Sequence, residues 1–212
     1  MLKAIIFDFD GVIVDTEEDR FDYLKRELKK YHYILEDKDF PNVSGRRTIN
    51  AIKDLFPDIP SDIVEKINND RKNIQKQNII KLKPISGLKK LLILLSKKNK
   101  LAIGTGSSKD VVKTFLDKKG LTKYFDKIIC SEDFDSSKPD PECYILTLKK
   151  LKVKPSEAII IEDSEAGITA GKKIGCKVFG LKNEYNAKQL KNADKTFNNY
   201  KELSEYFKSL KC

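Results

Sequence analysis

Two carboxylates stand at the end of the first apolar run of the chain. Asp8 and Asp10 lie in Phe7-Asp8-Phe9-Asp10-Gly11-Val12, within a β-branched and aromatic segment that begins at Ala4. Placing acids at the end of an apolar strand costs free energy unless a cation or a reaction requires them. A turn that merely ends the strand would account for Asp10 and Gly11 but not for Asp8, so we interpret the pair as functional.

A second polar cluster is rich in small residues and hydroxyls. The segment Gly104-Thr105-Gly106-Ser107-Ser108 follows the apolar run at residues 101–104. Small residues let backbone N–H groups approach an anion, and the hydroxyls of such a loop add further donors. A helix cap at Ser108 and a turn at Gly106 explain the cluster equally well, so both interpretations stay open at this point.

A third cluster again places acids after an apolar run. The segment Glu162-Asp163-Ser164 follows residues 158–161, and a helix cap by Asp163 or Ser164 is the simple alternative there. Lys138, in Ser137-Lys138-Pro139, also follows an apolar run. Taken alone, this lysine would be interpreted as a surface residue.

The three clusters and Lys138 together supply the parts of one kind of site. Carboxylates suit a hard cation such as Mg²⁺, and hydroxyl and amide groups donate to phosphate oxygens. A lysine balances the negative charge of both. Phosphoryl transfer needs little beyond such positioning and electrostatic neutralisation, so the combination predicts Mg²⁺-dependent phosphoryl chemistry.

The clusters fall where predicted strands end, and strands alternate with helices along most of the chain. Apolar runs predict strands at residues 4–9, 101–104, 127–130, 158–161, 177–180 and 195–197. Helical periodicity predicts helices at residues 87–98, 109–119, 141–151, 166–174, near 187–191 and from 201 onward. This order indicates an α/β protein with a doubly wound, mostly parallel, Rossmann-like sheet whose site lies at the carboxyl ends of its strands.

Residues 15–82 show helical patterns only. Thr16 is expected to cap a helix that runs to about Lys30, and further helices are predicted at residues 47–56 and 61–80. We therefore expect two domains: an α/β core domain at residues 1–14 and 83–212, and an inserted all-helical cap domain at residues 15–82.

Motif order, spacing and strand context resemble the haloacid dehalogenase-like (HAD) superfamily of aspartate-nucleophile phosphotransferases over nearly the whole chain. The insertion point and the helical cap resemble members near β-phosphoglucomutase and phosphoglycolate phosphatase. The resemblance implies that Asp8 is the nucleophile and Asp10 the general acid/base. It implies a phosphoryl-binding set made of Thr105, Gly106, Ser107 and Lys138. It also implies a Mg²⁺ site made of Asp8, the Asp10 carbonyl, Asp163 and the adjacent Glu162.

Two activities remain open within this resemblance. Asp10 argues for phosphoryl chemistry, because the dehalogenases of the superfamily lack this second acid. We expect a phosphatase acting on a small phosphorylated metabolite such as a sugar phosphate, with a β-phosphoglucomutase-like phosphosugar mutase as the alternative. Against the mutase, Arg20 stands where its cap carries a histidine, and Thr48 takes the position of its phosphate-binding arginine. Arg46 and Arg47 lie within one turn of Thr48, and with Arg20 they are the candidate substrate residues of the cap.

Composition bounds the class of protein. The 212 residues carry 42 Lys and Arg against 32 Asp and Glu, which gives a formal net charge of +10. That surplus keeps a nucleic-acid or regulatory binding protein as a rival class. It sits in short lysine pairs with no aromatic residues between them to stack on bases, so we do not expect a nucleic-acid partner.

The sequence shows no pattern typical of a membrane span, a signal peptide, a disulfide framework or a zinc site. No apolar run approaches the ~18 residues of a membrane span, and Asp8 and Asp10 interrupt the segment that a signal peptide would keep apolar. The four cysteines form no Cys-x-x-Cys pair and His32 is the only histidine, so neither a disulfide framework nor a zinc site is expected. We expect a reduced, cytoplasmic, monomeric protein whose partner is a small phosphorylated metabolite rather than a membrane.

Overall fold

A parallel sheet forms the centre of the larger part of the molecule. The computed structural model describes residues 1–43, 48–184 and 186–210. Its six strands are β1 (Ala4–Phe7), β2 (Lys100–Gly104), β3 (Lys127–Ile129), β4 (Ala158–Glu162), β5 (Lys177–Leu181) and β6 (Lys195–Phe197). They lie in the order β3-β2-β1-β4-β5-β6, and every neighbouring pair is parallel. The predicted fold class is confirmed, and the order of the strands reverses between β1 and β4, where such sheets place their ligands.

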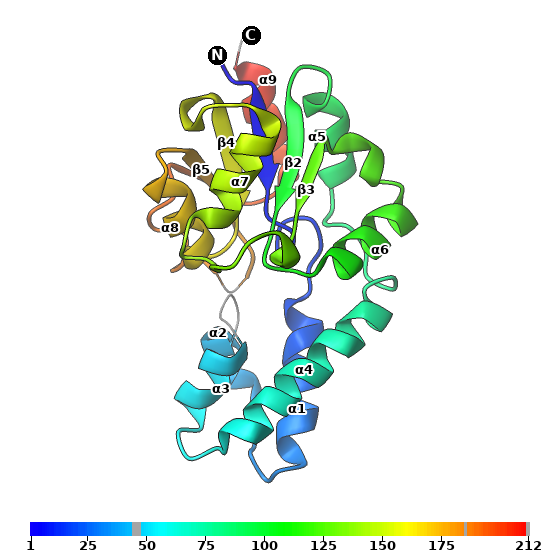
Figure 1. Cartoon of the computed structure of the whole chain (residues 1–212), viewed down its shortest axis with the longest axis vertical. Coiled ribbons are helices and arrows are strands. Elements are labelled where there is room, and N and C mark those ends of the chain that lie inside the picture. Colours follow the sequence, from blue (N-terminus) through cyan, green and yellow to red (C-terminus); the bar gives the residue numbers. More distant parts are fainter. Residues whose placement is uncertain (44–47, 185, 211–212) are drawn as a thin grey trace.

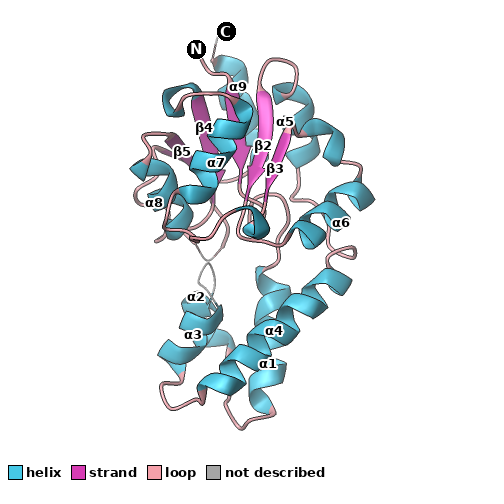
Figure 2. Ribbon diagram, in the orientation of Figure 1, coloured by secondary structure: helices cyan, strands magenta, loops and turns pink. Residues whose placement is uncertain are grey.

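Helices cover both faces of the sheet (Figure 2). One face packs on α5 (Leu88–Leu95), α6 (Lys109–Lys119) and α9 (Tyr200–Ser209), and the other on α7 (Glu142–Leu151) and α8 (Glu165–Lys173). Successive side chains of a strand point to opposite faces. In β1, Ile5 and Phe7 therefore face the first set of helices and Ala4 and Ile6 the second, all fully buried. A strand covered on both sides must be apolar throughout, which is why these runs show no alternation.

A separate group of helices lies beyond the carboxyl ends of the strands (Figure 1). This helical unit comprises α1 (Glu17–Lys29), α2 (Phe40–Val43), α3 (Thr48–Leu55) and α4 (Ser61–Asn78), with a 3₁₀ turn at Asp37–Asp39. Its apolar side chains form a hydrophobic cluster of their own, which includes Phe21, Leu24, Ile52 and Val64. The described part of residues 15–82 contains no strand, as the sequence predicts.

The chain passes between the sheet and the helical unit twice, and the two passages lie side by side. Val14 forms an isolated antiparallel bridge with Pro84. The Ile85 N–H donates to the Ile13 carbonyl at 3.0 Å. Both connections are therefore tied together at the base of the helical unit, next to the end of β1.

Two sequence predictions about elements are wrong. The first strand ends at Phe7 rather than at residue 9, because the chain folds into a tight loop in which Gly11 N–H donates to the Val14 carbonyl. Gly11 adopts a φ of 72° there, which a glycine takes without strain. Residues 187–191 form turns instead of a short helix. The Asn186 side chain, bonded to the Leu181 and Asp163 carbonyls, sets the course of the chain just before them.

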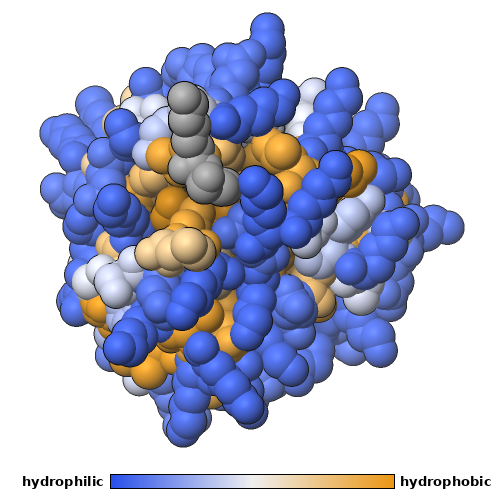
Figure 3. Space-filling view, turned by 90° about the horizontal axis from the view of Figure 1, so that it is seen from above, coloured by the Kyte–Doolittle hydropathy of each residue, from blue (hydrophilic) through white to orange (hydrophobic). Residues whose placement is uncertain are grey.

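The end of the molecule where both termini lie is covered largely by hydrophilic side chains, with smaller apolar areas between them (Figure 3). No helix among the described residues is both long and apolar enough to cross a membrane.

Asp194 is expected to make the fold sensitive to acid. Its carboxylate accepts the Val178 N–H at 2.7 Å and the Lys172 ammonium at 2.6 Å, which joins the chain before β6 to β5 and α8. Partial burial raises the pKa of Asp194, but these two donors outweigh it and hold the pKa below 3.8. The unfolded state therefore binds more protons in acid, so this contribution to stability is present above about pH 4 and is lost as the pH falls through the folded-state pKa.

We expect Asp194→Asn to lower the free energy of unfolding by about 1 kcal/mol at pH 6, the usual worth of a partly exposed charge-assisted hydrogen bond, and by less at pH 3. Urea unfolding at the two pH values measures this difference. Asp58→Asn, at an exposed position of the helical unit, is the control. An equal loss at both pH values would contradict the role of the ionised carboxylate.

Candidate active site

The ammonium of Lys138 lies at the centre of the polar groups that follow the strands. Its Nζ is 2.5 Å from Asp8 Oδ1, 2.7 Å from Glu162 Oε1 and 3.2 Å from the Gly104 carbonyl. These three groups come from the ends of β1, β4 and β2, so the sheet brings them to one point. Nζ also lies 4.6 Å from the centre of the Tyr144 ring. Burial by itself would lower the pKa of Lys138, but Asp8 and Glu162 hold it well above its usual value.

Glu162 is completely buried, and both of its carboxylate oxygens accept hydrogen bonds. Oε1 accepts from Lys138 and, at 2.8 Å, from the Tyr144 hydroxyl. Oε2 accepts at 2.9 Å from the N–H groups of Asp163 and Ser164 and from the Ser164 hydroxyl. Burial alone would raise the pKa of Glu162, but these donors keep it below its ordinary value. The structure therefore shows Glu162 as the partner of Lys138, and its part in metal binding stays a prediction.

Glycine is required at two positions beside these acids. A Cβ at Gly167 would stand 1.6 Å from Glu162 Oε1, and a Cβ at Gly11 would stand 1.9 Å from Asp163 Oδ2. Neither distance is compatible with a side chain. Gly11 belongs to the first sequence motif, but only the folded chain shows which carboxylate each glycine accommodates.

Asp8, Glu162 and Asp163 form a buried acidic cluster whose ligand atoms all lie within 4.8 Å of one another. Burial raises the pKa of Asp8 to about 7, although the neighbouring Lys138 acts in the opposite direction. Burial, and then the charges of Glu162 and Asp8, raise the pKa of Asp163 well above its ordinary value. One ammonium faces three carboxylates, so a further positive charge would be stabilised here. Carboxylate oxygens at this spacing fit Mg²⁺, which prefers hard oxygen ligands.

Asp10 is held by side chains from three segments of the chain. Its Oδ1 accepts from the Thr16 hydroxyl at 2.7 Å and from Gln75 Nε2 of α4 at 3.4 Å, and its Oδ2 accepts from the Ser107 hydroxyl. Thr16 therefore does not cap α1 with its side chain, contrary to the sequence prediction. Its hydroxyl donates to a carboxylate instead, and Asp15 Oδ1 accepts the Glu17 N–H at 3.1 Å.

The loop after β2 is only partly as predicted. Thr105 is 1% exposed, and its hydroxyl oxygen accepts the Ser107 N–H at 3.1 Å. Ser107 is engaged with Asp10, and the side chain of Ser108 makes no cap bond to α6. Gly106 has open space around it, with no atom of the described chain within 4 Å of where a Cβ would be. The helix-cap alternative for Ser108 is thus wrong.

The predicted substrate residues of the helical unit are placed in part. Arg20 lies on α1, where Nη2 donates to Glu17 Oε2 at 2.5 Å and to the Val43 carbonyl at 2.7 Å. Arg46 and Arg47 lie outside the described residues. Thr48 is buried in α3.

Several residues that contact the site were not predicted from the sequence. Tyr144 lies on α7 and donates its hydroxyl to Glu162; a polar hydroxyl among apolar neighbours is the one sequence feature that could have indicated its role. Asn186 donates its Nδ2 to the Asp163 carbonyl at 2.8 Å, and no sequence feature indicated this contact. Gln75 and Arg71 of α4 lie within a long charged helix, where their polarity is unremarkable in sequence. They are found only because α4 passes close to Asp10.

Mg²⁺ is expected to raise the melting temperature of the wild-type protein. At about a hundred times its dissociation constant a ligand stabilises by about 2.7 kcal/mol, which corresponds to about 5–10 °C for a chain of this length. Asp163→Asn should lose most of that rise, because an uncharged amide is a weaker Mg²⁺ ligand. Differential scanning fluorimetry with and without Mg²⁺ measures both, with Asp58→Asn as the control. Equal shifts in Asp163→Asn and wild type would contradict a metal site at Asp163.

Comparisons with known proteins agree with this geometry. The chain matches the family described as haloacid dehalogenase-like hydrolase over residues 5–181. It is 29% identical over 191 residues to a phosphorylated carbohydrates phosphatase of Thermotoga maritima, covering 87% of this chain and 88% of that protein. It is 30% identical over 184 residues to the phosphoglycolate phosphatase of Aquifex aeolicus, covering 83% of each. The crystal structure of β-phosphoglucomutase from Clostridium difficile superposes with a TM-score of 0.76 at 25% identity, covering 99% of this chain and 96% of that one.

The family match runs from β1 to β5 and so contains every residue of the acidic cluster and Lys138. The family and the phosphatases among the relatives identify an enzyme that acts by phosphoryl transfer. The chain belongs to the haloacid dehalogenase-like hydrolase family.

Proposed function

We propose that this enzyme is a Mg²⁺-dependent phosphatase that hydrolyses a small phosphorylated metabolite through a phosphorylated Asp8. The observation that supports this proposal is the contact of the Lys138 ammonium with both Asp8 and Glu162, beside Asp163. One oxygen of Asp8 is held by Lys138, which leaves the other for nucleophilic attack. A second acid, Asp10, stands on the same loop to handle the proton.

The reaction has two steps. In the first, an Asp8 oxygen forms a bond to phosphorus, the bond from phosphorus to the alcohol oxygen breaks, and Asp10 donates its proton to that oxygen. In the second, water attacks the phosphorus of the phosphorylated Asp8 while Asp10 accepts a proton from the water. Phosphate leaves and the Asp8 carboxylate is restored. Lys138 stabilises negative charge on the phosphoryl oxygens in both steps.

Asp8, Asp163 and the Asp10 carbonyl would hold Mg²⁺, with Glu162 beside them. When bound, the cation neutralises negative charge on the phosphoryl oxygens. Thr105 would donate its hydroxyl to the phosphoryl group, because that oxygen already accepts the Ser107 N–H. Gly106 leaves open space in the same loop, where a phosphoryl oxygen could approach the backbone. In this arrangement Ser107 contributes its backbone, while its hydroxyl holds Asp10.

Residues 15–82 would act as a cap domain over a core of residues 1–14 and 83–212. Asp10 supports this division, because its carboxylate is bonded to Thr16 and Gln75 from the helical side and to Ser107 from the core side. A cap in this place would exclude water from the site and contact the organic part of the substrate. The relative from Thermotoga maritima, named for phosphorylated carbohydrates, supports a sugar phosphate as substrate.

A phosphosugar mutase is the second candidate, and the superposition on β-phosphoglucomutase over almost the whole chain favours it. A mutase would return the phosphoryl group of Asp8 to the sugar instead of to water. Arg20 stands at the position of the mutase histidine and forms an ion pair with Glu17, which favours the phosphatase. Incubation with a hexose 1-phosphate and a bisphosphate primer decides, because only a mutase would form the 6-phosphate faster than free phosphate.

Replacement of Asp8 by asparagine is expected to abolish phosphate release. Removing a nucleophile typically lowers kcat by more than about 10³-fold, because the remaining groups cannot form the covalent intermediate. Phosphate release from a panel of sugar phosphates and an aryl phosphate, with and without Mg²⁺, measures the effect. Asp58→Asn is the control for the same chemical change at an exposed site. Metal-independent release, or release that survives in Asp8→Asn, would refute the mechanism.

Replacement of Asp10 by asparagine is expected to have an effect that depends on the leaving group. An alkoxide leaves only when protonated, so kcat/KM for alkyl phosphates should fall by about 10²–10⁴-fold. An aryl oxide leaves without protonation, so kcat/KM for an aryl phosphate should fall much less. The ratio of the two losses is the measurement. Equal losses for both leaving groups would show that Asp10 does not protonate the departing oxygen.

A further inference from the structure

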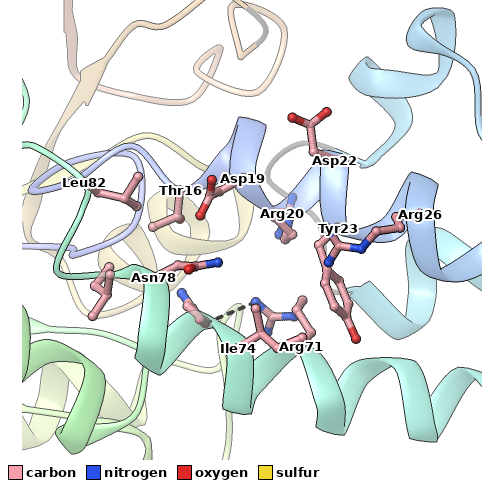
Figure 4. A pocket seen from close by; sticks show the side chains of 12 residues that line it. Thr16, Asp19, Arg20, Asp22, Tyr23, Arg26, Arg71, Ile74, Asn78 and Leu82 are labelled. Carbon is pink, nitrogen blue, oxygen red and sulfur yellow. Dashed lines mark hydrogen bonds between the residues drawn. The ribbon is translucent and has the colours of Figure 1, made fainter.

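A cavity of about 210 Å³ lies between α1 and α4 of the helical unit. At one end it is lined by Thr16 and Gln75, the two residues that donate to Asp10 Oδ1. A ligand in this cavity would therefore lie next to the proposed acid/base group. Further from Asp10 the lining includes Arg20 and Tyr23 of α1, which Figure 4 shows opposite Arg71 of α4.

Arg71, which lines this cavity, has hydrogen-bonding capacity that the described residues do not use. Its Nη1 donates to Gln75 Oε1 at 3.2 Å, while its Nε is buried without a hydrogen-bond partner among the described residues. A guanidinium offers five N–H donors in a planar fork, and a buried donor left without an acceptor costs about 1–3 kcal/mol. Arg71 would thus gain from an acceptor that enters the cavity.

The charges around Arg71 point to an anionic acceptor. Burial, and then the nearby positive charge of Arg20, lower the pKa of Arg71, while Asp10 and Glu17 act in the opposite direction. Arg20 is paired with Glu17, and the two carboxylates that line the cavity, Asp19 and Asp22, lie at exposed positions on α1. A carboxylate or phosphate can accept two parallel N–H bonds from a guanidinium fork, which makes an oxyanion the natural ligand.

We propose that Arg71, assisted by Arg20, binds a second oxyanion of the substrate in this cavity. The substrate would then be a phosphate ester that carries another anionic group, a carboxylate or a second phosphate, on the part held by the helical unit. This inference rests on the proposed function, because that function places the reacting phosphate of the substrate beside Asp8. The cavity volume suits a small group of a few heavy atoms rather than a nucleotide or a polymer.

Arg71 could instead position Asp10, and the test must distinguish this role from binding of a second oxyanion. Through Gln75 it is two hydrogen bonds away from Asp10, so it could position the acid/base group. A positioning role would affect every substrate to the same degree. Binding of a second oxyanion would affect only the substrates that carry one.

The test compares three matched series of esters. These are the monophosphates of straight-chain diols of two to five carbons, the same chains with a terminal carboxylate, and the same chains with a terminal phosphate. We expect Arg71→Gln to lower kcat/KM for the charged series by about 10- to 100-fold, as for other hydrogen bonds to charged groups, and to change the neutral series by less than about threefold. The terminal group whose esters lose more kcat/KM identifies the oxyanion. The chain length with the highest kcat/KM gives the separation between the two anionic groups of the substrate.

Two control variants accompany the comparison. Arg71→Lys keeps the positive charge without the planar fork and should restore part of the preference. Lys66→Gln removes an exposed positive charge from the same helix and should leave all three series unchanged. Two results would overturn the proposal without contradicting the phosphatase activity. One is an equal loss of kcat/KM for all three series in Arg71→Gln, and the other is an equal kcat/KM for charged and neutral esters in wild type.

Binding to Asp8→Asn separates this proposal from the proposed function. Isothermal titration with Mg²⁺ present compares the charged and neutral esters of the best length in Asp8→Asn and in the Asp8→Asn, Arg71→Gln double variant. Tighter binding of the charged ester that disappears in the double variant supports the subsite, even if no ester is hydrolysed by wild type. Equal affinities, or no binding of either ester, would overturn it.

Discussion

The burial of one ammonium among carboxylates is the interaction on which the site depends. Lys138 contacts Asp8 and Glu162 from inside the protein, where an ion pair is stable only if its remaining hydrogen bonds are satisfied. Tyr144 and Ser164, together with the Asp163 N–H, satisfy those of Glu162. One positive charge remains too little for three buried acids. The surplus of negative charge at this end of the sheet would be stabilised by a divalent cation, as the proposed mechanism requires.

The sheet and the helical unit contribute different things to that chemistry. Asp8, Lys138 and Glu162 lie at strand ends and on one loop beside the sheet, so their spacing does not depend on the helical unit. Asp10 is different, because two of its three partners come from Thr16 and from Gln75 on α4. The same stretch of α4 carries Arg71. In the proposed function, proton transfer and recognition of the substrate would therefore depend on the helical unit, and charge neutralisation on the groups at the strand ends.

Local sequence pattern determined most of the fold. Uninterrupted apolar runs predict the central strands because those strands are covered on both faces, and the turn-rich polar segments after them mark the edge where ligands bind. The predictions failed where a side chain has a tertiary partner. Thr16 bonds to Asp10 instead of capping α1, and turns take the place of a helix at residues 187–191, next to Asn186.

By itself the sequence determined the acids, the lysine and the order of strands and helices, because residue types and periodicity are local properties. Only the tertiary structure decided which groups touch. It made Glu162 the fully bonded partner of Lys138, turned Ser107 toward Asp10, and brought Gln75 and Arg71 from a charged helix to the edge of the site. Apart from the Arg71–Gln75 bond, which spans one turn of α4, these contacts join residues far apart in the chain, so no local pattern encodes them.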